Sequence, residues 1–445
     1  MCWNRLMSTS LPQFKIKPVV WASGERFAMI VDRATGIPLI EPTIFAVTEM
    51  RQIGLAHATI EQAMSAIRIL ILFLISKKID VRYRIHKEGK FLEINEIEEL
   101  IFLCRLRQPQ IDTKLGCVSD EQNSKLNLKN PSNVRSLQGF RRRSRRSTSE
   151  KVGRGTTNIR LTYIVMYLKW LTAHELTRID SRDVLHRYTR ENVDAALSAL
   201  KAKRIQRANL NLKTKRNGLT VEVINRLHEV LDPSSSENPW RPGFNRYRNR
   251  LYIYWLLEVA LRRGELLALK LEDLSFGADE AKIIRRPDNP DDPRVDAPLV
   301  KTHERVLKIN AALLGYTEEY LEMRRKFVNA RRHGYLFVSS RSGAPLSLSA
   351  ARDIFYALRK KVSGLPSTLS AHVFRHTWNT LFTNHAFETN MSEKMREDLM
   401  KNQNGWSDKS NMPNYYSRMA IGKKAQQESL KVQEKIHKIR KRDLK

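Results

Sequence analysis

The chain of 445 residues is poor in cysteine and has no long hydrophobic run. Its three cysteines, Cys2, Cys104 and Cys117, form no Cys-x-x-Cys pair, which excludes a disulfide framework and a thiolate zinc site. The longest apolar run, Ile69–Ile75, is far shorter than the roughly 20 residues that span a bilayer. The first ten residues lack the apolar core of a signal peptide. We therefore expect a cytoplasmic protein with no membrane partner.

Several motifs of nucleotide and metal chemistry are also missing. No Gly-x-x-x-x-Gly-Lys-Ser/Thr loop occurs, which excludes nucleotide hydrolysis of the P-loop type. The His-Glu pairs at 174–175 and 303–304 lack the second histidine of a zinc-binding His-Glu-x-x-His. Gly153 and Gly155 are not followed by a third glycine, because residue 158 is Asn, so the dinucleotide-binding fingerprint fails.

Acidic residues are scarce relative to basic ones. The 79 Lys and Arg residues exceed the 47 Asp and Glu residues and give a formal net charge of +32. Hydrophobic residues make up 41% of the chain, which is a folding composition rather than a disordered one. So large a positive charge indicates a polyanionic partner such as a nucleic acid.

In the N-terminal half, alternating apolar residues predict a β-hairpin over 14–32, with its turn at residues 23–25. This hairpin either contacts DNA or packs on its own domain. Helical periodicity begins at Thr59, a candidate N-cap, and recurs over 94–106 and 157–175. The polar stretch 107–156 contains an arginine-rich segment that is either a phosphate-binding insertion or a solvated loop.

The second half begins after a basic, polar stretch at 201–216 and the Asn217-Gly218 turn, which together mark the best domain boundary. The predicted helices that follow cover 219–231, 246–262 and 264–271. A short sheet is expected from strands at 281–286, 295–300 and 304–309, whereas the proline-rich 287–293 cannot be a strand. The last 25 residues predict a basic helix with Val432, Ile436 and Ile439 on one face. The fold class expected is mainly α with a small antiparallel β-sheet (α+β).

Polar residues interrupt three apolar segments of the second half. Arg262 lies between two core-forming stretches and, alone, reads as an ion-pair partner of Glu265 or Asp273. His372, Arg375 and His376 fall on one helical face at i, i+3 and i+4. No carboxylate or cysteine completes a metal site there, so we expect no metal. The tyrosines of Asn414-Tyr415-Tyr416 would, alone, indicate only packing.

Taken together and in order, these segments resemble the tyrosine recombinase (phage integrase) family. The matching stretches are LRRGELLALKLED (261–273), VKTHERVLKI (300–309), AHVFRHTWNTL (371–381) and GWSDKSNMPNYYSR (405–418). The first has the family's spacing of Arg, Glu and Asp, and the second its turn lysine. The third is the family's His-x-x-Arg-His. The fourth places a tyrosine ten residues after a glycine.

The resemblance implies the role of each matching residue in DNA cleavage. Arg262 and Arg375 would neutralise the non-bridging oxygens of a phosphodiester, and Tyr415 would be the nucleophile. Lys301 would protonate the 5′-hydroxyl leaving group.

The same resemblance assigns two further residues. His372 would act as acid/base or as a phosphate ligand, and Trp406, in place of the commoner histidine, would donate its indole N–H to the phosphate. No cofactor is expected. No metal is expected, because Arg262 and Arg375 can neutralise the phosphate oxygens, and no ATP, because the phosphotyrosine bond stores the energy of the broken bond.

Two positions leave alternatives open. Tyr416 adjoins Tyr415, and the ten-residue spacing from Gly405 favours Tyr415. Arg263 adjoins Arg262, and the spacing to Glu265 favours Arg262.

The resemblance also implies a domain organisation. A helical core-binding domain would precede an integrase-type catalytic domain. The expected ranges are 1–45 (hairpin arm), 46–200 (core-binding domain with the insertion 107–156), 201–218 (basic linker), 219–420 (catalytic domain) and 421–445 (C-terminal helix).

We therefore expect a site-specific DNA recombinase, the integrase of a mobile element, which clamps double-stranded DNA and works as a homotetramer on synapsed sites. Accessory DNA-bending proteins and association with the nucleoid belong to this expectation. The alternatives are a type IB-like topoisomerase, revealed by relaxation without a specific site, and a non-catalytic DNA-binding regulator. The simultaneous presence of the six matched residues argues against the regulator.

Overall fold

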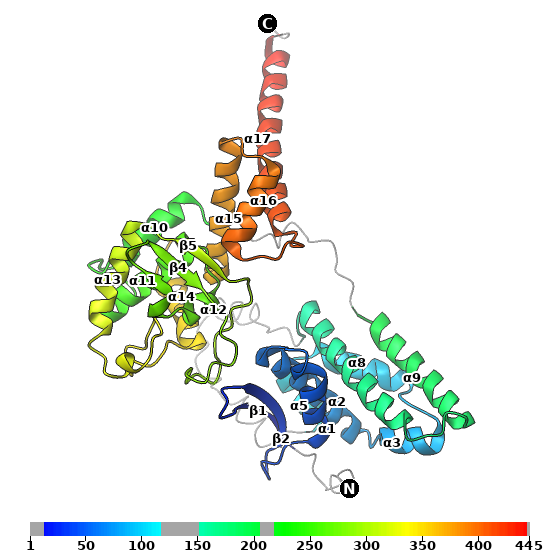
Figure 1. The fold of residues 1–445 in the computed structure, drawn as a ribbon. Helices are drawn as coiled ribbons and strands as arrows, with labels where there is room; N and C mark the ends of the chain where they lie inside the picture. Colours follow the sequence, from blue (N-terminus) through cyan, green and yellow to red (C-terminus); the bar gives the residue numbers. More distant parts are fainter. Residues whose placement is uncertain (1–12, 117–150, 205–217, 443–445) are drawn as a thin grey trace, which may run out of the picture. The chain divides into compact units, whose positions relative to one another are not determined.

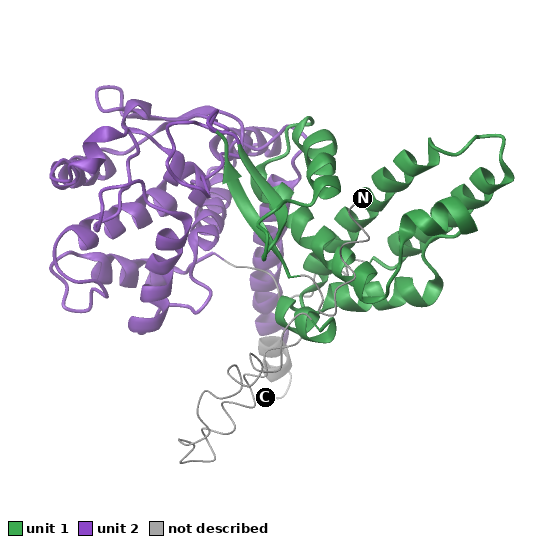
Figure 2. Ribbon diagram, turned by 90° about the horizontal axis from the view of Figure 1, so that it is seen from below, with its two compact units in different colours: residues 1–21, 26–209 green, residues 22–25, 210–445 purple. Residues whose placement is uncertain are grey.

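The computed structural model describes residues 13–116, 151–204 and 218–442, with side chains to residue 436. The chain divides into two compact units, residues 1–21 with 26–209 and residues 22–25 with 210–445 (Figure 2). The predicted linker 201–218 and the arginine-rich part of the predicted insertion fall largely outside the described residues. The domain ranges expected from the sequence therefore stay predictions.

Unit 1 is a helical body with one β-hairpin. Strands β1 (Phe14–Val20) and β2 (Arg26–Asp32) pair antiparallel with Phe14 opposite Asp32, as the alternating pattern predicted. The helices that follow are α1 (Ile40–Phe45), η1 (Ala46–Arg51), α2 (His57–Ser76), α3 (Val81–Tyr83), η2 (Arg84–Glu88), α4 (Ile94–Arg105), α5 (Gln108–Lys114), α8 (Arg154–Leu176) and α9 (Val184–Ala202). The predicted helices at 94–106 and 157–175 are thus confirmed as α4 and α8.

Helix α2 is the core element of unit 1 and packs against α8, α4 and the hairpin. It begins at His57 with Ala56 as its N-cap, so the prediction that Thr59 caps it is wrong. By length and composition α2 could cross a membrane, the one such helix in the part of the chain that the structure describes. Most of its apolar stretch is buried against the other helices of unit 1, which is the ordinary environment of a core helix.

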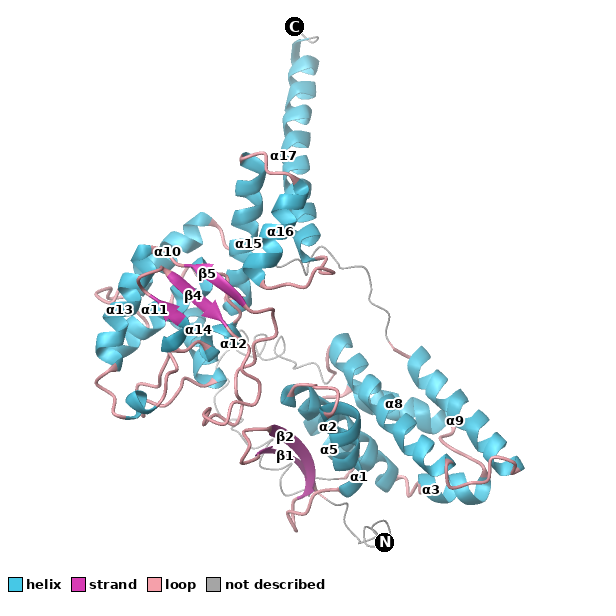
Figure 3. Ribbon diagram, viewed as in Figure 1, coloured by secondary structure: helices cyan, strands magenta, loops and turns pink. Residues whose placement is uncertain are grey.

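Unit 2 surrounds a small sheet with helices (Figures 1 and 3). Strands β3 (Leu274–Ser275), β4 (Glu280–Ile283) and β5 (Arg305–Lys308) form an antiparallel sheet in the order β3-β4-β5. The helices are α10 (Val221–Leu231), α11 (Phe244–Glu258), α12 (Arg263–Ala268), η4 (Leu271–Asp273), α13 (Ala311–Arg324), η5 (Asn329–Arg332), α14 (Leu348–Lys361), α15 (Ala371–Glu388), α16 (Glu393–Asn404) and α17 (Met412–Arg442). The mainly α fold class with small antiparallel sheets is confirmed.

The buried helix α11 organises unit 2. It contacts α13, α15 and α12 and buries Tyr252 and Trp255 completely. It ends at Glu258, four residues before the predicted end, because Ala260 adopts a left-handed backbone with φ of 59° that no α-helix accommodates. This break directs the chain into α12, where the first matched segment lies.

The loop from β4 to β5 differs from its prediction. The expected strand at 295–300 is wrong, since these residues form an irregular segment. The buried Arg294 holds this loop down: it pairs with Asp292 at 2.8 Å and donates to the carbonyls of Leu267 and Leu346, both at 3.0 Å. These hydrogen bonds fix the loop to the body of unit 2, so the loop does not pair with the sheet. The sheet gains its third strand from β3, which had not been predicted.

The predicted C-terminal helix is the second part of a longer helix. α17 runs without interruption from Met412 to Arg442 and carries Tyr415 and Tyr416 in its first turns. Residues 421–436 are all exposed, including Val432 at 54% and Ile436 at 60%. The side chain of Ile439 lies outside the described residues. Val432 and Ile436, the described part of the apolar stripe, are therefore not docked on their own unit.

Candidate active site

A buried carboxylate, Glu265, lies at the centre of the matched segments. It stands in the first turn of α12, is 1% exposed, and accepts the backbone N–H of Arg262 at 2.9 Å. Its other contacts come from the β4–β5 loop and β5: the Thr302 hydroxyl at 2.7 Å and the Arg305 guanidinium at 2.9 Å. Arg262 adds a side-chain contact at 3.2 Å. One carboxylate thus links α12 to the loop that carries Lys301.

Arg375, on α15, is the third guanidinium beside this carboxylate. It is 4% exposed and lies 3.7 Å from Glu265. It donates to the carbonyls of Ala260 at 2.7 Å and Asn404 at 2.6 Å. Burial, with the charge of Arg262 beside it, lowers the pKa of Arg375 to about 9, so the group stays protonated at neutral pH.

The end of α16 is held by the same arginines. Asn404 presents its carbonyl to Arg262 at 3.4 Å and to Arg375, while Arg305 donates to the carbonyl of Gln403 at 2.9 Å. Guanidinium groups at a helix C-terminus satisfy carbonyls that lack a helical partner and complement the negative end of the helix dipole. The cations are thereby fixed before any substrate arrives.

The charge of this cluster is unbalanced. Three guanidinium groups surround Glu265, so the centre has an excess of two positive charges. Burial alone would raise the pKa of Glu265, but Arg305 and Arg375, with hydrogen bonds from Thr302 and the Arg262 backbone, lower it below its usual range. The carboxylate therefore stays ionised, and the remaining excess favours an anion with several oxygens, such as a phosphodiester.

Gly405 allows the closing loop to approach the cluster. It caps α16 in the left-handed region with φ of 59°, and its carbonyl accepts the backbone N–H of His303 at 3.1 Å. A Cβ there would lie 2.7 Å from Arg305 Nη1 and 2.8 Å from Thr302 Cβ. Glycine is therefore required by both conformation and space. This junction brings Trp406 beside the loop of Lys301.

Lys301 itself is exposed and lies on the β4–β5 loop, next to Thr302. The hydrogen bond from Thr302 to Glu265 anchors the loop one residue away, so the lysine is tethered at its base and extends toward solvent. Trp406 is half-buried, and its ring lies 5.6 Å from the Arg375 guanidinium carbon.

The two tyrosines of α17 occupy different environments. Tyr416 is 3% exposed and stacks on Trp406 at 6.2 Å between ring centroids. Its hydroxyl lies 2.7 Å from Nδ1 of His376, and burial raises its pKa above the ordinary value. Tyr415 is half-buried and meets Tyr416 edge to face at 5.4 Å. Access to a phosphate therefore favours Tyr415, in agreement with the glycine spacing.

His372 and His376 lie one turn apart on α15. His372 is exposed, and its Nε2 lies 3.0 Å from Nε2 of His376. Arg375 is between them in sequence and faces the buried cluster. The structure thus brings Arg262, Arg375 and Trp406 together and places Lys301, His372 and Tyr415 on segments attached to that centre. Within the described ranges, no group of three or more His, Cys, Asp or Glu could hold a metal ion.

Sequence reasoning underrated two features. Arg305 and Thr302 are integral to the cluster, and neither was named as a site residue. Both belong to the matched segment 300–309, which was the available signal. The Tyr416–His376 contact had no signal, because a tyrosine and a histidine 40 residues apart show no common pattern. The sequence offered Glu265 or Asp273 as the ion-pair partner of Arg262. Arg262 pairs with Glu265, whereas Asp273 pairs with Arg286 at 2.5 Å.

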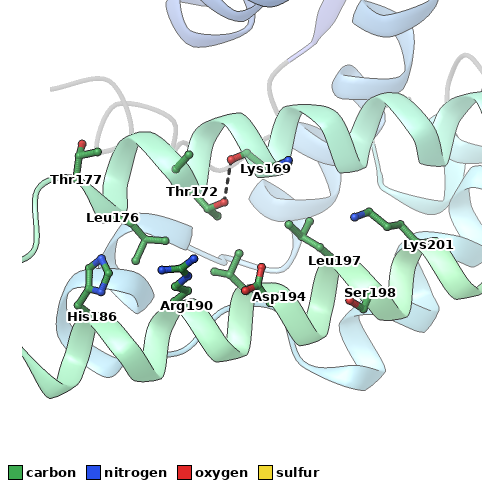
Figure 4. A pocket seen from close by; sticks show the side chains of 12 residues that line it. Lys169, Thr172, Leu176, Thr177, His186, Arg190, Asp194, Leu197, Ser198 and Lys201 are labelled. Carbon is green, nitrogen blue, oxygen red and sulfur yellow. Dashed lines mark hydrogen bonds between the residues drawn. The ribbon is translucent and has the colours of Figure 1, made fainter. Parts of the chain in front are cut away.

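A separate pocket of about 460 Å³ lies in unit 1 between α8 and α9 (Figure 4). Its lining includes Lys169, Arg190 and Lys201, with Asp194 on the same face of α9 as Arg190. None of the six predicted site residues borders it. It is a groove of mixed polar and apolar lining, distinct from the arginine cluster.

Comparisons with known proteins find a match over the region that holds the arginine cluster. Residues 218–420 match the model of the phage integrase family. Transposase A from transposon Tn554 of Staphylococcus aureus is 24% identical over 229 residues, which cover 51% of this chain and 57% of that protein. The chain thus spans little more than half the length of this curated relative.

Among solved structures, the Tn1549 transposon integrase in complex with circular intermediate DNA is 15% identical, with a TM-score of 0.40, over 79% of this chain and 98% of that one. XerH site-specific recombinase bound to palindromic difH substrate is 16% identical, with a TM-score of 0.40, over 82% and 96%. The four ordered segments and the family match over 218–420 agree with each other. Residues 218–420 are thus similar to the phage integrase family of tyrosine recombinases.

Proposed function

We propose that this chain is a site-specific recombinase that cleaves and rejoins double-stranded DNA through a 3′-phosphotyrosine intermediate, for the integration and excision of a mobile element. The observation that carries the proposal is the arginine cluster around Glu265, joined to a helix that presents Tyr415. The similarity to a transposon transposase supports the mobile-element role.

The proposed chemistry assigns charge stabilisation to the arginines. In-line displacement at phosphorus builds negative charge on the non-bridging oxygens. Arg262 and Arg375 can neutralise these oxygens, and Trp406 can donate its indole N–H beside them. Because the cations are held by Glu265 and by the α16 carbonyls, little reorganisation is needed when the charge forms.

Tyr415 is the proposed nucleophile and Lys301 the proposed general acid. The Tyr415 hydroxyl releases its proton to solvent as its oxygen forms a bond to phosphorus. The bond from phosphorus to the 5′-oxygen breaks, and the 5′-oxygen takes a proton from Lys301. Rejoining reverses these steps, so neither metal nor ATP is required. His372 would contact the phosphate on the same side as Arg375.

The exposed tail of α17 suggests the assembly. Val432 and Ile436 lie on a helical segment with no cover from its own unit, and isolated helices are marginal in water. We propose that the tail docks on a neighbouring protomer, passed head-to-tail around a homotetramer on synapsed DNA. Removal of residues 430–445 should spare binding to a single site and abolish the paired complex in a gel-shift assay. Unchanged pairing would contradict trans docking.

The proposed reaction is tested by trapping the covalent intermediate. Nicked duplexes tiled across the ends of the element that carries the gene are incubated with the chain in EDTA and without ATP, then separated in denaturing gels. A protein–DNA adduct that forms with wild type and with Tyr416→Phe, but not with Tyr415→Phe, is expected. Relaxation of plasmids that lack these ends would instead identify a topoisomerase.

A further inference from the structure

Three side chains outside the arginine cluster form a continuous hydrogen-bonded chain. The Tyr416 hydroxyl, on α17, meets Nδ1 of His376 at 2.7 Å, and Nε2 of His376 meets Nε2 of His372 at 3.0 Å. The two histidine rings are edge to face, with centroids 4.3 Å apart. This hydrogen-bond network leads from the buried Tyr416 phenol to His372, which is exposed beside the candidate site.

When both imidazoles are neutral, the protons of these two hydrogen bonds can be arranged in only two ways. In the first, Tyr416 donates to Nδ1 of His376, and Nε2–H of His376 donates to Nε2 of His372, whose own proton is on Nδ1. In the second every bond is reversed: His372 donates from Nε2, and His376 donates from Nδ1 to the Tyr416 oxygen. A neutral imidazole has one donor and one acceptor nitrogen, so no mixed arrangement keeps both bonds.

The surroundings of Tyr416 decide between them. Burial, the largest influence, raises its pKa, and although Arg375 and Arg262 oppose this, the phenol keeps its proton. In the second arrangement that proton would need another acceptor. The charged or titratable groups that act on Tyr416 are these two guanidinium ions, which only donate, and Tyr415, which meets it edge to face; Trp406 stacks on it. Among the described residues, the hydrogen-bond partner of the Tyr416 hydroxyl is Nδ1 of His376. The first arrangement gives the phenol proton an acceptor, Nδ1 of His376.

We propose that Tyr416, acting through His376, holds His372 in the neutral tautomer with its proton on Nδ1. The lone pair on Nε2, with which His372 would accept a proton, is occupied by the N–H of His376. His372 is thereby a hydrogen-bond donor from Nδ1 and not a general base. Given the proposed function, that donor serves a non-bridging phosphate oxygen. Tyr416 and His376 are positioning residues, because they act through His372.

The tautomer can be read directly without DNA. The full chain is labelled with ¹⁵N-histidine, and two-bond and three-bond couplings from the carbon-bound ring protons to the ring nitrogens distinguish Nδ1–H from Nε2–H. His372→Gln assigns the signal of His372. We expect the Nδ1–H form in wild type and in the matched control Tyr415→Phe. In Tyr416→Phe the phenol proton is gone, and we expect the Nε2–H form of His372 to appear.

Two results would overturn the proposal. An Nε2–H signal for His372 in wild type contradicts it even if Tyr416→Phe fails to fold. A folded Tyr416→Phe protein with unchanged His372 signals contradicts it as well. Because both readouts use DNA-free protein, failure of the proposed recombination leaves this test intact. In the adduct assay Tyr416→Phe should react about tenfold more slowly than wild type with unchanged DNA binding, whereas Tyr415→Phe should not react.

Discussion

Glu265 is expected to be the most sensitive single position of the arginine cluster. Glu265→Gln keeps the size of the side chain but removes the negative charge that faces Arg262, Arg305 and Arg375. The amide nitrogen would also present a donor to groups that are themselves donors. Three buried or half-buried guanidinium ions would then lack their counter-charge.

The magnitude follows from burial. Removing one partner of a buried ion pair costs about 3–5 kcal/mol, because the remaining charge stays desolvated. A domain has about 5–15 kcal/mol of stability in total, so Glu265→Gln should lose a large part of it. The matched control is Glu272→Gln, seven residues later. Glu272 is 63% exposed and pairs with Lys270 at 3.4 Å and with Arg286 at 3.3 Å, and such surface pairs contribute at most about 1 kcal/mol each.

Urea unfolding of the full chain measures both variants. The pH dependence gives a second readout. Since the pKa of Glu265 is lower in the folded state, its ionisation stabilises the fold above the unfolded pKa of about 4.3. That contribution is lost as pH falls through the folded pKa, so the gap between wild type and Glu265→Gln should narrow in acid. A Glu265→Gln loss equal to that of Glu272→Gln would refute the central role of this carboxylate.

Three further outcomes are expected. Gly405→Ala should lower the free energy of unfolding by at least about 1–2 kcal/mol because of its left-handed backbone, and the clash with Arg305 adds to this loss. The control Gly422→Ala, on the exposed part of α17, should leave the stability unchanged or raise it in thermal unfolding. Lys301→Ala should cleave normal DNA very slowly and should regain a nearly wild-type rate when sulfur replaces the bridging 5′-oxygen, because a thiolate leaves unprotonated. Arg375→Ala should gain much less from the sulfur. Equal rescue of both variants would show that Lys301 is not the general acid. DNA affinity measured by fluorescence anisotropy should fall as salt is raised. With roughly six phosphate contacts, the slope of the logarithm of the association constant against the logarithm of the salt concentration should be about −5 or steeper. A flat response would contradict the role given to the +32 charge.

Periodicity predicted the helices well because their apolar stripes are local properties of the sequence. The hairpin at 14–32 and the helices α4 and α8 lie where the patterns placed them. The strand expected at 295–300 does not form, because Arg294 is buried against the carbonyls of Leu267 and Leu346 and holds this segment on the body of unit 2. Such a contact has no local signature.

The site residues were predicted from ordered motifs, and their arrangement was not. The sequence offered Glu265 or Asp273 as the ion-pair partner of Arg262, and the structure shows Glu265, at 3.2 Å. The backbone N–H bond from Arg262 to Glu265 at 2.9 Å was not predicted. Spacing could not show that Arg305 completes the cluster, because three segments more than 30 residues apart meet there. Nor could it show that Tyr416 is buried against His376, which depends on how α17 packs on α15.

The most direct measurement identifies the residue that becomes bonded to DNA. The trapped adduct is digested with protease and nuclease, and the nucleotide-bearing peptide is sequenced by mass spectrometry. The peptide contains both tyrosines of α17, so fragmentation between them assigns the phosphate. We predict a 3′-phosphate on Tyr415. A phosphate on Tyr416, or on any residue outside α17, would contradict the account.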